Sequence, residues 1–399
     1  MTRRFVVPVA ALLALTPFLY VVYAGSLDLK VYRTGGYAWL HGISLYSEHF
    51  ADLVPGIRLP FTYPPLAAIL FVGLEVLPLT VAEILMNLAS VAGLTATALV
   101  VSWRLAGWNQ RALLAGLVVS AGAMVLEPVR STIGFGQVNL ILMGLVALDC
   151  LLPKTRWPRG LLLGLAIAIK LTPAVFILFF LVRRQFRPAL VASASFAGFS
   201  LTAGALAPAD SAKYWFGVLF DPARIGGATY AFNQCYQAIL HRVMADGPGR
   251  SLLWLALVAA TGVLATVAAR RARTEGDDVR ALLAIAVWGL LASPVSWSHH
   301  WVWILPATLY LWQRSSWMLL ATIPFVIGPH TLLDPEGRHW SLPEHLIGSS
   351  YVLLGLAFLV FAATRRGPRT GPEYAGTGRG LGAGGASGVA ASGPETPRG

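Results

Sequence analysis

The residues of this sequence that are best suited to chemistry are polar side chains next to long apolar runs. Asp28 follows the first apolar run, residues 5–24, by a few positions, and Lys30 and Arg33 come soon after it. A carboxylate in this place can act as a general base, and neighbouring cations can hold an anionic group. From position alone, a solvated loop whose charges anchor the first span explains the same three residues equally well.

Further polar residues stand at the ends of later apolar runs. They are Tyr63, Glu127, Arg130, Gln137, Asn139, Lys170, Asn233, Gln234 and the run Ser296-Trp297-Ser298-His299-His300. Any single one of them is more simply a helix cap or a helix–helix hydrogen bond. Polar groups at helix ends in lipid are costly unless a cavity or a ligand satisfies them. Because the topology below brings all of them to one membrane face, the sequence predicts a shared site there.

The histidines and cysteines do not have the spacing of a metal site. His299 and His300 are adjacent, so on a helix they point about 100° apart and do not form an i, i+4 zinc pair. We favour His300 slightly as the residue that faces the site, and a structural hydrogen-bonding role stays open. Cys150 and Cys235 are predicted to stay unpaired. No Asp-x-Asp pair occurs, so no cofactor and no divalent metal are expected.

Composition predicts a polytopic membrane protein. The 399 residues are 56% hydrophobic and 12% charged, whereas a soluble domain is about a quarter charged. The net charge of +12 comes from Lys and Arg that cluster in short loops between apolar runs. Such clusters are typical of topology determinants, so we expect membrane lipids and no nucleic acid as partners.

The apolar runs predict about twelve crossings and one half-inserted helix, with both termini in the cytoplasm. Spans are expected over 5–24, 81–105, 113–126, the run between Asn139 and Lys154, 189–207, 252–269, 281–296, 299–312, 317–332 and 346–363. Residues 161–182 are expected to form two short helices broken at Thr172-Pro173, with Lys170 at the tip, and 66–77 to enter only halfway. Cleavage after the first run is the less favoured alternative, as is a topology in which 66–77 crosses and 161–182 is one helix.

The domain organisation follows from these spans. One catalytic domain is expected over residues 1–365, with external loops at 25–62, 208–250 and 333–345. The remaining residues, 366–399, are rich in Gly, Pro, Ser and Ala, and this composition predicts a disordered cytoplasmic tail.

Five motifs occur in an order that resembles a known family. They are Asp28-Leu-Lys-Val-Tyr-Arg33, Phe61-Thr-Tyr-Pro-Pro65, Gly136-Gln-Val-Asn139, Lys170-Leu-Thr-Pro173 and Ser293-Pro-Val-Ser-Trp-Ser-His-His-Trp301. Over about residues 1–365 the chain resembles the actinobacterial polyprenol-phosphate-mannose-dependent α-(1→2)-mannosyltransferases, and among them most the enzymes that act on phosphatidylinositol mannosides. The resemblance implies an all-α GT-C fold, a polyprenyl-phosphate-mannose donor and a phosphatidylinositol-mannoside acceptor. It implies a tetramannoside-to-pentamannoside type of step on the outer face of the plasma membrane.

The resemblance also implies roles for single residues. Asp28 matches the family's catalytic aspartate and would take the proton of the acceptor's 2-hydroxyl in one inverting displacement. His300 and His299 are the further catalytic candidates, as hydrogen-bond donors. The groups implied for the donor phosphate are Lys170, Arg33 and Arg130. The residues implied for the sugar or acceptor are Tyr63, Gln137, Asn139, Asn233, Gln234 and Trp297.

Two alternatives stay open from the sequence. The same fold could use another polyprenyl-phosphate sugar, such as an arabinofuranose donor, or a lipomannan or peptide acceptor. A secondary transporter would also be polytopic, but that class predicts internal repeats and polar residues near the bilayer midplane. The sequence shows no internal repeat.

Overall fold

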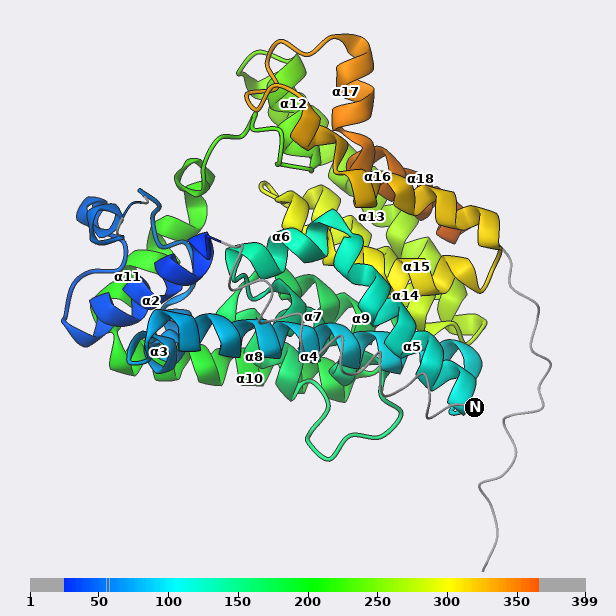
Figure 1. The fold of residues 1–399 in the computed structure, drawn as a ribbon, viewed down its shortest axis with the longest axis horizontal. Coiled ribbons are helices and arrows are strands. Elements are labelled where there is room, and N and C mark those ends of the chain that lie inside the picture. Colours follow the sequence, from blue (N-terminus) through cyan, green and yellow to red (C-terminus); the bar gives the residue numbers. More distant parts are fainter. Residues whose placement is uncertain (1–24, 55, 57, 366–399) are drawn as a thin grey trace, which may run out of the picture. The chain divides into compact units, whose positions relative to one another are not determined.

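The computed structural model describes residues 25–54, 56 and 58–365 (Figure 1). The predicted first span, 5–24, and the predicted tail, 366–399, lie outside the described residues. Within the described part all regular structure is helical, and an isolated bridge between Asn233 and Trp297 is the only strand-like pairing there. The all-α class is confirmed for these residues.

The helices follow one another along the chain with the following bounds. The α-helices are α2 (Leu27–Leu40), α3 (Pro65–Glu75), α4 (Leu79–Ala106), α5 (Gln110–Gly122), α6 (Glu127–Phe135), α7 (Asn139–Leu151), α8 (Leu161–Ile169), α9 (Ile177–Val182), α10 (Phe186–Leu206), α11 (Pro208–Phe216), α12 (Tyr236–Val243), α13 (Pro248–Thr274), α14 (Asp278–Ala292), α15 (Ile304–Trp312), α16 (Ile323–Ile327), α17 (Leu342–Gly348) and α18 (Ser350–Thr364). The 3-10 helices are η1 (Glu48–Leu53), η2 (Ala123–Val125), η3 (Thr172–Phe176), η4 (Val218–Phe220), η5 (Pro222–Ile225), η6 (Ser298–Trp303), η7 (Ser316–Thr322) and η8 (Pro329–Leu332).

Three of the described helices, α4, α10 and α13, are each long and apolar enough to cross a membrane. The number rises to five if α5 with α6 and α17 with α18 each form one bent span, with bends of 75° and 65°. Shorter apolar helices, among them α3 and α7, occur besides these elements. The described part of the chain is therefore all-helical, its apolar helices are those of a membrane protein, and the count of about twelve crossings stays a prediction.

One expected span is interrupted by its own sequence. Residues 317–332 were expected as one helix, but the chain forms η7, α16 and η8 in succession. Gly328 ends α16 with a left-handed backbone at φ 66°, and Pro329, which has no N–H to continue a helix, follows directly. The apolar length of this run predicted one span, and the stop at Gly328-Pro329 was missed.

The predicted break within residues 161–182 is confirmed. Helix α8 ends at Ile169, Lys170 has an extended backbone with φ −150° and ψ 127°, and η3 starts at Thr172. Pro173 cannot donate the backbone hydrogen bond that a continuous helix would make to the Ile169 carbonyl. The break falls at Lys170, slightly before Thr172-Pro173, and the lysine side chain contacts Asn139 and His300.

Helices α2 and α3 pack closely against each other. A Cβ atom added at Gly36 would lie 2.9 Å from the backbone nitrogen of Val72, and one added at Gly35 would lie 2.5 Å from the Phe61 ring. Tyr32 of α2 is fully buried and stacks on Phe71 of α3, with ring centroids 4.4 Å apart. Two small residues on one helix therefore bring α2 close enough to fix the position of its polar side chains.

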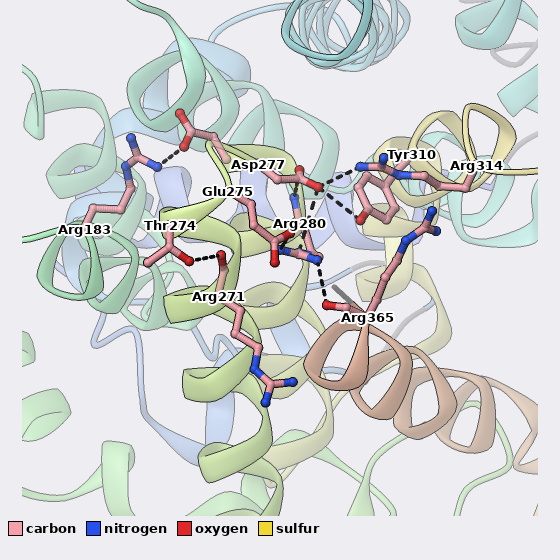
Figure 2. Close-up of polar contacts among 10 residues, drawn as sticks. Arg183, Arg271, Thr274, Glu275, Asp277, Arg280, Tyr310, Arg314 and Arg365 are labelled. Atoms are coloured by element: carbon pink, nitrogen blue, oxygen red, sulfur yellow. Dashed lines mark hydrogen bonds and ion pairs between the residues drawn. The ribbon is translucent and has the colours of Figure 1, made fainter. Parts of the chain in front are cut away.

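A network of ionic groups joins the turn between α13 and α14 to neighbouring helices (Figure 2). Asp277 caps α14 by accepting from the backbone of Arg280, and it also accepts from Arg314 Nη2 at 2.8 Å and Tyr310 Oη at 3.2 Å. The guanidinium of Arg280 is almost fully buried and donates to Glu275 at 2.6 Å. Every carboxylate of this network faces a cation, as buried charges require.

The next residue, Asp278, extends this network to two other helices. It accepts hydrogen bonds from Arg104 at the end of α4 and from Arg183 directly after α9. We call Asp277, Asp278, Glu275 and their arginine partners the arginine network.

Candidate active site

Polar side chains from five separate segments meet at one place. The segments are the start of α2, the stretch before α3, the turn between α6 and α7, the break between α8 and η3, and η6. We call the residues that they contribute the site cluster: Asp28, Tyr32, Tyr63, Gln137, Asn139, Lys170, His299 and His300. Seven of these eight were predicted as site residues from the sequence, and Tyr32 was not.

A glycine turn places Gln137 beside Asp28. Gly136 ends α6 with a left-handed backbone at φ 68°, and a Cβ atom there would lie 2.7 Å from Leu29 Cβ. A side chain at this position would therefore be strained and would push α2 away. The backbone N–H of Ser26 donates to the Gly134 carbonyl at 3.2 Å, which holds the start of α2 against the same turn.

Gln137 has a defined orientation because two tyrosines share its oxygen. Tyr32 Oη donates to Gln137 Oε1 at 2.7 Å, and Tyr63 Oη lies 3.1 Å from the same oxygen. The amide nitrogen of Gln137 is then free to donate to the carboxylate of Asp28, with which it is hydrogen-bonded. Burial raises the pKa of Asp28 to about 6, while the Gln137 hydrogen bond and the charge of Lys170 act in the opposite direction. Asp28 is thus a carboxylate poised to accept a proton near neutral pH.

Lys170 supplies a cation that no carboxylate neutralises by direct contact. Its Nζ donates to Asn139 Oδ1 at 2.9 Å and lies 3.1 Å from His300 Nε2. An ammonium has only donors, so His300 Nε2 must be the acceptor and the ring must be neutral. The ammonium also lies 5.3 Å from the centroid of the Tyr63 ring. Because its partners are neutral, the positive charge of Lys170 remains available to an anionic ligand.

The structure distinguishes the two adjacent histidines. His300 contacts Lys170, whereas the His299 ring packs edge-on against Phe135 with centroids 5.5 Å apart. The backbone carbonyl of His299 accepts from Asn139 Nδ2 at 3.1 Å and from Thr132 at 3.0 Å. These contacts agree with the slight preference for His300, and the catalytic role of either ring stays a prediction.

Arg33 and Arg130 lie outside the site cluster. Arg33 Nη1 donates to the carbonyls of Leu74 and Leu77 at 2.5 and 2.7 Å and lies 3.5 Å from Glu75, so it caps the end of α3. The exposed Arg130 donates to the Val326 carbonyl at 3.1 Å. The structure thus gives both arginines contacts that do not involve the site cluster.

Asn233, Gln234 and Trp297 hold two loops together. Asn233 Oδ1 accepts from the Ser296 backbone at 2.9 Å, and Gln234 Nε2 donates to the Gly348 carbonyl at 2.7 Å. The Asn233–Trp297 bridge pairs the segment before α12 with the run that leads into η6. These residues therefore fix the place of the histidines, and sugar binding by them stays a prediction.

Glu127 is one of the polar residues that the sequence places at the end of an apolar run, and the sequence predicts no specific role for it. It is buried, its Oε1 accepts from Ser131 at 2.7 Å and Ser298 at 2.8 Å, and its Oε2 accepts from Tyr351 at 2.8 Å. These bonds join α6, η6 and α18 next to the histidines.

The sequence signal that could have identified Tyr32 is its spacing from Asp28. Tyr32 lies four residues after Asp28 and therefore on the same face of the helix.

No metal-binding group is present among the described residues. No set of three or more His, Cys, Asp or Glu side chains there could hold a metal ion. Cys150 and Cys235 are both free and buried, as predicted.

Comparison with known proteins identifies the family of the chain. Residues 61–294, more than half of its length, match the model of glycosyltransferase family 87. The chain belongs to glycosyltransferase family 87. It is therefore a glycosyltransferase, and the matched segment contains Tyr63, Gln137, Asn139 and Lys170 of the site cluster.

Three relatives of this family 87 protein have related names. The polyprenol-phosphate-mannose-dependent alpha-(1-2)-phosphatidylinositol mannoside mannosyltransferase of Mycolicibacterium smegmatis is 41% identical, over 86% of this chain and 85% of the relative. The protein of the same name from Mycobacterium tuberculosis is 39% identical, over 87% and 86%. A phosphatidylinositol pentamannoside mannosyltransferase of Mycobacterium tuberculosis, with the same donor and linkage in its name, is 36% identical over 72% and 66%. No solved structure matches the chain.

Proposed function

We propose that this family 87 enzyme transfers mannose from polyprenyl-phosphate-mannose to a phosphatidylinositol mannoside and forms an α-(1→2) linkage. The names of its relatives, which are similar over most of the chain, support the donor, the linkage and the class of acceptor. The mechanism rests on one observation: Asp28, whose pKa is raised to about 6, and Lys170 lie in the same cluster, and each is hydrogen-bonded to neutral groups.

Asp28 is the general base in this mechanism. As the acceptor's 2-hydroxyl oxygen forms its bond to the anomeric carbon, its proton passes to the Asp28 carboxylate, and the bond from that carbon to the phosphate oxygen breaks. A β-linked donor that gives an α-linked product requires inversion, so one displacement suffices without a covalent enzyme intermediate. Gln137, fixed by Tyr32 and Tyr63, orients the carboxylate by a hydrogen bond.

Lys170 binds the leaving polyprenyl phosphate in this mechanism. Negative charge grows on the phosphate as the glycosidic bond breaks, and a preorganised ammonium stabilises that charge. Asn139 and His300 hold the ammonium without neutralising it. Arg33, Arg130 and His299 stay secondary candidates for the phosphate, and Tyr63, Asn233, Gln234 and Trp297 for the sugar. The reaction needs no divalent metal in this mechanism, so a chelator is expected to leave transfer unchanged.

The acceptor in this proposal is a tetramannoside, which the enzyme extends to a pentamannoside. Two relatives are named for phosphatidylinositol mannoside as the acceptor, and the relative named for the pentamannoside is less similar and shares a smaller part of the chain. This difference in similarity favours the shorter acceptor.

We further propose a GT-C arrangement with about twelve crossings in the plasma membrane, both termini cytoplasmic and the site cluster on the outer face. Basic loops are typical of the cytoplasmic side of a membrane. Arg104, Arg183 and Arg314 lie in the arginine network, apart from the site cluster, and this separation supports opposite faces for the two regions. One catalytic domain over 1–365 and a separate tail over 366–399 complete the proposal.

Transfer by the purified full-length enzyme tests the proposal. The enzyme in lipid nanodiscs receives polyprenyl-phosphate-mannose with tri-, tetra- or pentamannoside acceptors, and mass spectrometry follows the products. We expect transfer to the tetramannoside and an α-(1→2)-linked product that an exo-α-(1→2)-mannosidase removes.

The matched controls separate the parts of the proposal. A donor that carries arabinofuranose in place of mannose tests the sugar, and the pentamannoside tests the acceptor. Faster transfer to the pentamannoside than to the tetramannoside would show that the pentamannoside is the acceptor. Faster transfer of arabinofuranose than of mannose would show that the donor carries arabinofuranose. Neither result bears on the general-base role of Asp28, which its own variants test.

A further inference from the structure

A cavity with a volume of about 670 Å³ lies between the ends of α4, α7 and α9 and the starts of α10 and α14. Its walls comprise Arg104, residues 150–153, Arg159, residues 183–188 and Asp278. None of these residues belongs to the site cluster, so the cavity is separate from the proposed reaction site. We call it the arginine cavity.

The charge of the arginine cavity is strongly positive. Five of its lining residues are arginines and one is an aspartate, so the lining carries five minus one, or four, net positive charges: Arg104, Arg159, Arg183, Arg184 and Arg187 against Asp278. Asp278 accepts from Arg104 and Arg183 (Figure 2 draws Arg183). The other three arginines have no carboxylate partner within the lining. Guanidinium groups gathered around one cavity repel one another, and a bound anion would reduce this repulsion.

The acidic group next to the cavity is already engaged. Asp149 is fully buried and accepts from the backbone N–H groups of Gly160 and Leu163 at 2.9 and 3.0 Å, and from Trp157 Nε1 at 3.0 Å. It therefore holds the loop between α7 and α8 in place and does not bind a guanidinium of the cavity directly. Arg159 instead donates to neutral carbonyls, among them that of Pro153 at 3.0 Å, which leaves its charge uncompensated.

Two residues of the wall are held in unusual states. The side-chain oxygen Oε1 of Gln185 is buried and has no hydrogen-bond partner among the described residues. Arg184 has a left-handed backbone with φ 57°, which costs free energy in a residue with a Cβ atom. An unpartnered amide oxygen can accept from a hydroxyl group, and arginines at a positive cavity can bind a phosphate, so both agree with a ligand that carries a phosphate and a hydroxyl group.

The surface next to the cavity identifies the source of that phosphate. Helix α10 starts at the cavity wall with Phe186, whose surface is 65% exposed, and Leu190 one turn later is 70% exposed. This helix is one of those long and apolar enough to cross a membrane. Acyl chains can lie along this apolar face while a headgroup enters the cavity, whereas a soluble phosphate would gain nothing from it.

We propose that the arginine cavity binds the phosphate-bearing headgroup of an anionic phospholipid, whose acyl chains lie along α10. Guanidinium groups match phosphate oxygens in a bidentate geometry, and Arg184 and Arg187 are the exposed members that reach a headgroup first. Gln185 accepts a hydrogen bond from a headgroup hydroxyl. The site is a lipid site of the folded enzyme and takes no part in the transfer step.

The test measures lipid binding to the purified full-length enzyme in nanodiscs or micelles of zwitterionic lipid. Phosphatidylglycerol, phosphatidylcholine and inorganic phosphate are titrated separately, and native mass spectrometry and the unfolding temperature report binding. We expect saturable binding of phosphatidylglycerol that raises the unfolding temperature, and no saturable effect of the other two probes. The double variant Arg184→Asn with Arg187→Gln should weaken phosphatidylglycerol binding by about tenfold or more, since each arginine contributes about 1 kcal/mol near anionic lipid.

The variants are chosen so that folding does not decide the result. Asn tolerates the left-handed backbone of residue 184, and neither arginine makes a hydrogen bond or ion pair that would be lost within the described chain. Arg156→Gln is the matched control, because this exposed arginine lies in the neighbouring loop outside the cavity lining. Transfer activity in zwitterionic lipid should be unchanged in all variants.

Three results would overturn the proposal. The first is equal binding of phosphatidylcholine, and the second is an equal loss of phosphatidylglycerol binding in Arg156→Gln. The third is stabilisation by inorganic phosphate that matches phosphatidylglycerol, which would make the cavity a site for soluble phosphate. Arg187→Glu provides a second reading, since a reversed charge should weaken phosphatidylglycerol binding more than its removal does.

Discussion

The site cluster and the arginine network are two polar regions of one apolar protein, and they treat charge differently. In the arginine network each carboxylate directly meets a guanidinium, as Asp277 meets Arg314 at 2.8 Å. In the site cluster Asp28 is hydrogen-bonded to an amide, and Lys170 to an amide oxygen and an imidazole. In both regions the carboxylates have hydrogen-bond partners, but only the site cluster leaves opposite charges without direct contact.

This difference indicates which region performs chemistry. A carboxylate bound to a guanidinium holds helices together and is a poor base, because the ion pair favours its charged form. Asp28 has a pKa raised to about 6 because burial outweighs the Gln137 hydrogen bond and the Lys170 charge. The comparison therefore separates ionic groups that stabilise the fold from ionic groups that stay available to substrate.

Replacement of Asp28 should have the largest effect on activity. We expect Asp28→Asn and Asp28→Ala to lower kcat by about 10²- to 10⁴-fold, because general-base catalysis contributes about that much. The same variants should not destabilise the protein. A carboxyl whose pKa is raised in the folded state stabilises the fold below its unfolded pKa of 3.8 and loses that contribution as pH rises through about 6. At pH 7 the buried carboxylate is ionised, which costs free energy of folding. A neutral side chain at this position removes that cost.

The control for this prediction is Asp52→Asn, because Asp52 is an exposed acid in the same segment before α3. Initial rates of mannose transfer and unfolding temperatures are measured together for all three variants. Full transfer by both Asp28 variants would remove the residue as the base.

Replacement of Lys170 should have the second-largest effect. We expect Lys170→Gln to lower kcat by about 10²- to 10³-fold, since one preorganised group that stabilises developing charge contributes that order of magnitude. The effect should lie in kcat more than in KM for the donor, and exposed Lys213→Gln is the matched control. A rise in KM with unchanged kcat would show that Lys170 binds the ground state only.

The arginine network should respond in stability and not in chemistry. Asp278→Ala leaves Arg104 and Arg183 without their carboxylate, so we expect a loss of about 3 kcal/mol in the free energy of unfolding. The activity of each folded molecule should be nearly unchanged. Asp246→Ala is the control, since Asp246 is 87% exposed in its pair with Arg250. A selective loss of activity in folded Asp278→Ala would break the comparison between the two regions.

The pH profile should show the titration of Asp28. The base must be ionised, so we expect kcat/KM for the acceptor to fall up to about tenfold per pH unit below about 6 and to level off above it. Rates are measured between pH 4.5 and 8, in about half-unit steps, with enzyme stability checked at each pH. A flat profile down to about pH 4.5 would contradict the raised pKa.

Replacement of Gln137 should have the smallest effect, a shift in the pH profile of the transfer rate. Gln137→Leu removes the hydrogen bond that lowers the pKa of Asp28, so the acidic limb should move to higher pH by less than about one unit. Gln313→Leu is the control, because Gln313 is exposed and lies outside the site cluster. A shift to lower pH would show that Gln137 does not favour the ionised carboxylate.

Local sequence signals predicted much of the helical arrangement. The opening of α7 at Asn139 and the break near Lys170 were both readable from proline and polar residues at the ends of apolar runs. The stop at Gly328-Pro329 was equally local but was outweighed by apolar length. Boundaries like these depend on backbone chemistry over a few residues, which a single sequence contains.

The sequence by itself determined that this chain is an all-helical membrane protein with a carboxylate, a lysine and two histidines at helix ends. Only the tertiary structure decided that Gln137 is hydrogen-bonded to Asp28 and that Arg33 and Arg130 bind carbonyls away from the site cluster. The physical reason is that composition and periodicity act over neighbouring residues, whereas a pKa and a hydrogen bond depend on groups that are far apart in the chain. Close packing of α2 on α3 and on the Gly136 turn sets those distances.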